Sequence, residues 1–151
     1  MTNSSTSVFE KAYNPVLQAA IVFGLGLTFM VLAKLVKWTG IMSPSDLFPW
    51  TTAASFMLFF SMFNSIFSLS AKNLNQYWNR SIISFMGLAV MLGLIAWLFS
   101  AVAISDAGSM KWIYIVLTLG YLIFLSMVGF IKRIVEFAQR EEWNQPRKRR
   151  K

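Results

Sequence analysis

The chain has 151 residues, enough for one ordinary domain; 56% of them are hydrophobic and only 13% are charged. A soluble domain carries about 25% charged residues to cover its surface, so this composition indicates a protein whose surroundings are largely lipid. The chain has no His and no Cys, which excludes Ser–His and Cys–His nucleophile pairs, Cys/His zinc sites, iron–sulfur clusters and disulfides. The net charge of +8 favours anionic lipid headgroups over nucleic acid, because the basic residues lie beside apolar segments.

Four stretches of the chain contain no Asp, Glu, Lys or Arg, and each has about 20 residues or more. A helix of that length crosses ~30 Å of hydrocarbon. The stretches lack the alternation of apolar and polar residues that is typical of the strands of a β-barrel, so the sequence argues against a barrel. The sequence therefore predicts an all-α integral membrane protein with a four-helix transmembrane bundle at residues 15–134. The predicted helices cover about residues 16–36, 48–70, 81–104 and 112–134.

The chain opens with a polar segment, residues 1–14, in which we expect a short interfacial turn. Asn14 and Pro15 then supply a helix cap and a proline at the first helical position. In the first helix, Ala20 and Gly24 lie four residues apart, and small residues at this spacing let two helices approach closely. We predict a helix-packing face there.

The second helix carries a stripe of small and polar residues on one face and phenylalanines on the opposite surface. The polar stripe consists of Ala54, Leu58, Ser61, Ser65 and Ser68, with Asn64 beside it. One interpretation is packing, in which small residues admit a neighbouring helix and the polar groups form hydrogen bonds across the contact. The other is a solute pathway, in which hydroxyls and the Asn64 amide line the route of a small solute or anion.

The third helix also has a small-residue stripe, with spacings of four, three and four residues. Its members are Ala89, Gly93, Ala96 and Ser100. A short connection joins the second and third helices, so we expect them to be antiparallel neighbours whose stripes meet in a close seam.

The last helix is predicted to continue beyond the membrane as a helical extension within residues 135–151, which ends in a polybasic tail. We expect the tail to bind anionic lipid headgroups. The predicted headgroup ligands are Lys132, Arg133, Arg147, Lys148, Arg149, Arg150 and Lys151.

The basic residues also predict an orientation. Eleven of the 14 Lys and Arg lie on the side that holds both termini, and only Lys34, Lys37 and Lys111 lie on the other side. The positive-inside rule then places both termini and the helical extension in the cytoplasm. We expect a bacterial cytoplasmic (inner) membrane protein.

The predicted spans contain no Asp or Glu, and proton- or sodium-coupled transport usually needs such a group inside the membrane. We therefore expect a protein that is not an enzyme and binds no cofactor or metal. It would serve as a structural or accessory subunit of a larger membrane complex or of a homo-oligomer. The alternative is a passive channel or uncoupled transporter for a small solute or anion, lined by the polar stripe of the second helix.

Overall fold

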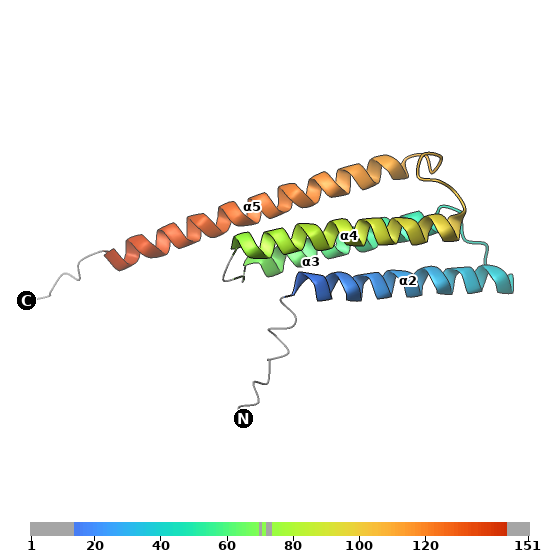
Figure 1. The fold of residues 1–151 in the computed structure, drawn as a ribbon, viewed down its shortest axis with the longest axis horizontal. Coiled ribbons are helices and arrows are strands. Elements are labelled where there is room, and N and C mark those ends of the chain that lie inside the picture. Colours follow the sequence, from blue (N-terminus) through green and yellow to red (C-terminus); the bar gives the residue numbers. More distant parts are fainter. Residues whose placement is uncertain (1–13, 70, 72–73, 145–151) are drawn as a thin grey trace, which may run out of the picture.

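The computed structural model describes residues 14–69, 71 and 74–144, with side chains described up to residue 140. Within this part the chain forms four helices and no strands: α2 (Pro15–Thr39), α3 (Phe48–Leu69), α4 (Leu74–Ser100) and α5 (Met110–Asn144). Consecutive helices run in opposite directions (Figure 1). Each is long and apolar enough to span a membrane, which indicates a multi-pass membrane protein.

Local chemistry explains where α2 begins and ends. The Asn14 side chain accepts a hydrogen bond from the Val16 N–H at 3.1 Å, and Pro15 needs no N–H partner at the first helical position. At the other end Gly40 adopts a left-handed conformation (φ 73°) and donates its N–H to the Lys37 carbonyl. A glycine is favoured there because it has no Cβ to oppose a positive φ.

The bounds of α4 differ from those expected from charge. The helix starts at Leu74 rather than near Ser81, because a helix can continue past the membrane boundary and carry Arg80 on its exposed surface. It ends at Ser100 rather than 104, since Ala101 turns to a positive φ of 56°. The Ser100 hydroxyl then accepts the Val102 N–H at 3.1 Å and stabilises the turn that follows.

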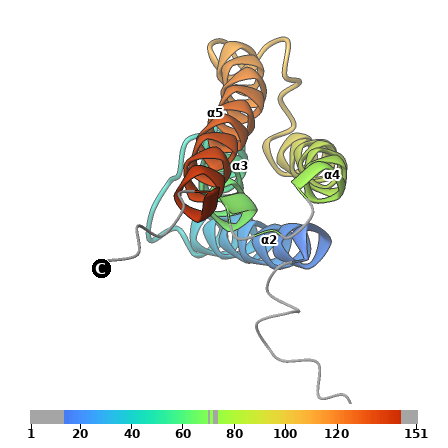
Figure 2. The same ribbon diagram turned by 90° about the vertical axis from the view of Figure 1, so that its left-hand side faces the viewer.

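Helix α3 lies at the centre of the bundle. It packs against α2, α4 and α5, and α2 also packs against α4, whereas α5 rests chiefly on α3. The end-on view shows α2, α4 and α5 arranged around α3, with α4 and α5 apart from each other along most of their length (Figure 2). The expected neighbour relation between the second and third helices is confirmed.

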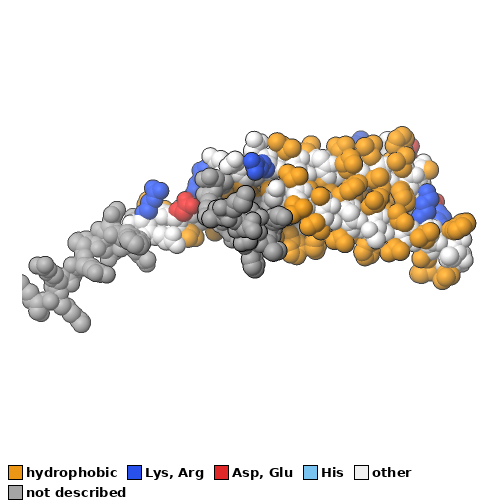
Figure 3. All heavy atoms as spheres, turned by 60° about the horizontal axis from the view of Figure 1, so that its bottom comes forward, with side chains coloured by type: hydrophobic (Ala, Val, Ile, Leu, Met, Phe, Trp, Pro, Cys, Tyr) orange, Lys and Arg blue, Asp and Glu red, His pale blue; other side chains and the backbone are white. Residues whose placement is uncertain are grey.

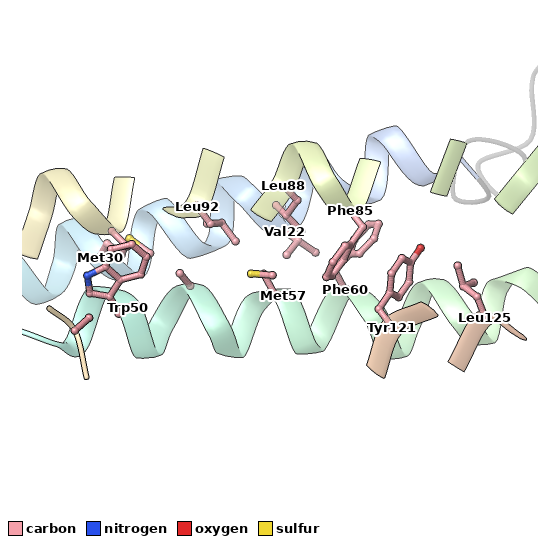
Figure 4. Packing of buried hydrophobic residues seen from close by; sticks show 13 residues of the cluster. Val22, Met30, Trp50, Met57, Phe60, Phe85, Leu88, Leu92, Tyr121 and Leu125 are labelled. Atoms are coloured by element: carbon pink, nitrogen blue, oxygen red, sulfur yellow. The ribbon is translucent and has the colours of Figure 1, made fainter. Parts of the chain in front are cut away.

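The core runs along the inner face of α3. Phe60 of α3, Phe85 of α4 and Tyr121 of α5 meet there, and the rings of Phe85 and Tyr121 stack with centroids 4.3 Å apart. Figure 4 shows these rings toward one end of the row and Trp50 and Met30 toward the other. One aromatic cluster thus contains a ring from each of three helices, and it stabilises the packing of α5 against α3.

The outer surface of the bundle is apolar between two charged ends. On the face seen in Figure 3, hydrophobic side chains cover the middle of the bundle, and Lys and Arg gather toward its ends. This arrangement suits a hydrocarbon layer bounded by headgroups on both sides.

Candidate functional site

The most polar buried site is centred on Asn64, in the second half of α3. Its side chain is completely buried, and it lies about five residues, or roughly 7 Å, from the end of the helix. An amide at this depth needs partners from the protein, because hydrocarbon offers none.

The Asn64 amide nitrogen donates two hydrogen bonds. One goes to the Gln18 side-chain oxygen on α2 at 3.0 Å, and the other to the Tyr77 hydroxyl on α4 at 3.2 Å. The Tyr77 hydroxyl in turn donates to the Asn64 backbone carbonyl at 3.3 Å, so α3 and α4 are joined at both the side chain and the backbone.

The Asn64 side-chain oxygen is the acceptor of the site. It receives a hydrogen bond from the Ser81 hydroxyl on α4 and one from the Tyr121 hydroxyl on α5 at 3.0 Å. The Ser81 and Tyr121 hydroxyls are themselves 2.8 Å apart. We call the five side chains together the polar cluster: Gln18, Asn64, Tyr77, Ser81 and Tyr121.

The polar cluster joins every helix of the bundle. Asn64 contributes both amide donors and its acceptor oxygen, and its partners come from each of the other three helices. The polar groups of the cluster form hydrogen bonds with one another inside the bundle. These bonds connect the four helices near the end of the bundle where α3 ends.

The serines of the α3 stripe form hydrogen bonds with their own helix. The Ser61, Ser65 and Ser68 hydroxyls donate to carbonyls three or four residues earlier, at 2.6–2.8 Å. All three side chains are buried, as is Ala54, whereas Leu58 of the predicted stripe is exposed. These buried side chains are small, and a small side chain permits a neighbouring helix to approach closely.

The small residues of α4 do not share one environment. Ala96 is completely buried in the core, while Ala89 and Gly93 are half-buried and line a groove beside α5. The half-buried Ser100 lies at the turn that ends the helix. The buried face of α4 is instead centred on Phe85, Leu88, Leu92 and Ala96.

The predicted small face of α2 lies on the outside of the chain. Ala20 and Gly24 are exposed, and a Cβ added at Gly24 would meet nothing within 4 Å. Gly26 is the glycine that packs internally, since its Cβ would lie 3.0 Å from Leu92 and 3.4 Å from Phe56.

Two of the predicted headgroup residues are described. The Lys132 ammonium donates to the Ala71 carbonyl in the connection between α3 and α4. This side chain therefore links α5 to that connection. Arg133 is exposed. The other predicted headgroup residues, Arg147, Lys148, Arg149, Arg150 and Lys151, lie outside the described residues, as does most of the predicted interfacial segment.

The polar cluster contains an amide pair and hydroxyls and no acidic or basic side chain. Among the side chains that the structure describes, no group of three or more Asp or Glu lies close enough together to hold a metal ion. The cluster can therefore form hydrogen bonds, and it has no group that exchanges protons near neutral pH.

Comparisons of this chain with known protein families, with curated proteins and with solved structures found no match.

Proposed function

We propose that this chain is a non-enzymatic structural or accessory subunit of a membrane complex or of a homo-oligomer. The observation that carries the proposal is the outward position of the Ala20 and Gly24 face on α2. The chain uses Val22, Gly26 and Met30 for its internal packing, which leaves the small residues free for a second chain.

The surface around that face is hollowed. A shallow apolar groove between α2 and α4 is lined by small residues from both helices, among them Ala19, Ala20 and Gly87. Small residues on two adjacent helices allow a third helix to approach their backbones, and close packing of this kind drives helix association in lipid. The groove thus supports assembly with another membrane-spanning segment.

Enclosure of the polar stripe also favours a packing role. Asn64 and the α3 serines are buried and hydrogen-bonded, so their polar groups already have partners. A passive channel or uncoupled transporter for a small solute or anion is the alternative proposal. It requires these groups to exchange their partners for solute.

The assembly proposal is tested by Gly24→Leu, with Gly120→Leu on α5 as the matched control, since a Cβ at either glycine meets nothing within 4 Å. We expect Gly24→Leu to release monomer during purification in mild detergent, while Gly120→Leu stays assembled and mass spectrometry identifies the same co-purifying chain as in the wild type. Circular dichroism checks that both variants are folded. Equal assembly of the two variants would contradict the proposal.

The alternative is tested in liposomes. If purified protein conducts small anions, and Asn64→Ala or Ser65→Val changes the flux, the chain is a pathway and the accessory role fails. If flux is absent or unchanged by both substitutions, the channel proposal loses its basis.

We further propose that the chain lies in a bacterial cytoplasmic membrane with both termini in the cytoplasm, where its basic tail meets anionic headgroups. The supporting feature is the excess of Lys and Arg on the side of the termini. A reporter fused after Lys151 should be active only in the cytoplasm, and activity on the opposite side would reverse the orientation.

A further inference from the structure

A pocket opens at the end of the bundle that lies away from the polar cluster. It is formed where α2 and α4 end and α3 begins, together with the connection between α2 and α3. Its inner part is apolar and is lined by Met30, Ala33, Phe48, Pro49 and Phe99.

The rim of the pocket is charged. Lys37 and Asp46 form an ion pair there with 2.7 Å between nitrogen and oxygen, so these two charges balance each other. Lys34, one helical turn earlier, points to the pocket with its ammonium 4.8 Å from the centre of the Phe99 ring. Among the described side chains, no carboxylate lies within 4.0 Å of the Lys34 nitrogen.

The pocket lies at the depth of lipid headgroups if the helices span a bilayer. Lys34 is 19 residues after Pro15, which starts α2, and this corresponds to roughly 28 Å along the axis. This length is close to the ~30 Å thickness of the hydrocarbon core, so the ammonium reaches the far interface.

From this geometry we propose that the pocket binds one anionic glycerophospholipid from the surrounding leaflet. The phosphate pairs with the Lys34 ammonium, and one acyl chain lies against the apolar part of the pocket beside Met30, Phe48 and Phe99. The occupant is an amphiphile because a cation at the rim adjoins an apolar interior.

Charge balance favours an anionic lipid over a zwitterionic one. Lys37 balances the charge of Asp46, so the charged residues that line the pocket carry one positive charge in excess, at Lys34. A headgroup with a net negative charge matches this excess better than a neutral one does. The pocket lies at the opposite end of the bundle from the C-terminal end of α5, and it does not depend on the assembly proposed above.

The test is native mass spectrometry of the full chain in detergent, titrated separately with phosphatidylglycerol and phosphatidylcholine. The variant is Lys34→Gln, and the matched control is Lys111→Gln, which changes a lysine on the same side of the bundle but outside the pocket. Ala33→Phe, which fills the apolar part, is a second variant.

We expect the wild type and Lys111→Gln to prefer phosphatidylglycerol about fivefold, the ratio that one basic residue near an anionic headgroup supplies. Lys34→Gln should bind both lipids equally, and Ala33→Phe should weaken both. The proposal is overturned if Lys34→Gln keeps the preference, or if Lys111→Gln loses it to the same extent. Displacement of the lipid by excess inorganic phosphate would also overturn it, since the site would then bind free phosphate.

Discussion

At the scale of single residues, Asn64 is a side chain whose hydrogen bonds link all four described helices. One amide serves as donor and acceptor for partners on three other helices. In lipid, an interhelical hydrogen bond contributes on average about 0.6 kcal/mol, because the unfolded chain in the membrane also finds partners. The stabilising effect of Asn64 therefore comes from the number of bonds that one residue makes.

We predict that Asn64→Ala lowers the free energy of unfolding by about 2 kcal/mol, the sum of four such bonds. The matched control is Ser61→Ala, because the Ser61 hydroxyl bonds only to Leu58 of its own helix. The control should change stability by about 0.5 kcal/mol or less. Unfolding in mixed micelles measures both, and equal losses would show that the cluster does not join the helices.

The centre of the polar cluster could be predicted from the sequence, but its partners could not. Asn64 is conspicuous because amides are rare at membrane depth. Gln18, Tyr77 and Tyr121 give no such signal. Gln18 lies near the end of the first predicted span, Tyr77 lies before the third predicted span, and Tyr121 is one aromatic residue within the fourth. Three-dimensional packing decides which of them face Asn64; the available signal was that each carries a polar group in or beside an apolar segment.

At the scale of the helices, absence of charge predicts the four elements well and their ends less well. Hydrocarbon excludes charge from each span, so each charge-free stretch falls largely within one helix. Helix ends depend instead on capping and backbone conformation. The structure therefore places the start of α4 at Leu74, and α5 continues to Asn144, well beyond its apolar part.

One contact between α4 and α5 depends on a glycine. A Cβ built at Gly129 of α5 would collide with the indole of Trp78 on α4. The indole is a rigid group, so it must shift as a whole to make room. Gly129 thus sets how closely the two helices meet at this end of the bundle.

We predict that Gly129→Ala destabilises the protein by about 1–3 kcal/mol, the usual cost of overpacking. Gly120→Ala on the same helix is the control, since its Cβ would meet nothing within 4 Å, and it should cause no loss. Thermal unfolding in detergent compares the two. Combining Gly129→Ala with Trp78→Leu should recover most of the loss, and failure to do so would show that the indole is not the obstacle.

At the scale of the whole molecule, the packing arrangement goes beyond what the sequence indicates. The short connection predicted that α3 and α4 are neighbours. The position of α5 on α3 had no comparable signal, because Gly120, Ser126 and Gly129 do not share one face of the helix. Buried Tyr121 and Leu125 fix that position, and both could equally have faced lipid in a different bundle.

The composition of the whole chain predicts a stability that does not respond to pH near neutrality. No His is present, so no side chain has an ordinary pKa between about 5 and 8. The hydrogen bond and charge of Lys37 lower the pKa of Asp46 below its ordinary value of 3.8. This ion pair therefore stabilises the folded protein at pH values above the ordinary pKa of 3.8. Its contribution is lost as the pH falls through the lowered pKa of Asp46.

The midpoint of thermal unfolding should accordingly stay constant between about pH 5.5 and 8. Asp46→Asn should lower it slightly in this range, because the pair is exposed, and the difference from the wild type should vanish in strong acid. A midpoint of unfolding that changes around pH 6.5 would contradict this prediction. A difference in midpoint between Asp46→Asn and the wild type that grows as the pH falls would contradict it as well.

The polar cluster also has a consequence for how the chain is made. Gln18, Asn64, Tyr77 and Ser81 leave the ribosome before Tyr121, so an unfinished chain that lacks α5 presents an Asn64 oxygen missing one of its donors. The polar cluster is complete only when α5 packs against α3 and brings the Tyr121 hydroxyl to Asn64. A chain truncated before α5 therefore carries a partly unsatisfied polar group at Asn64 that the complete chain satisfies.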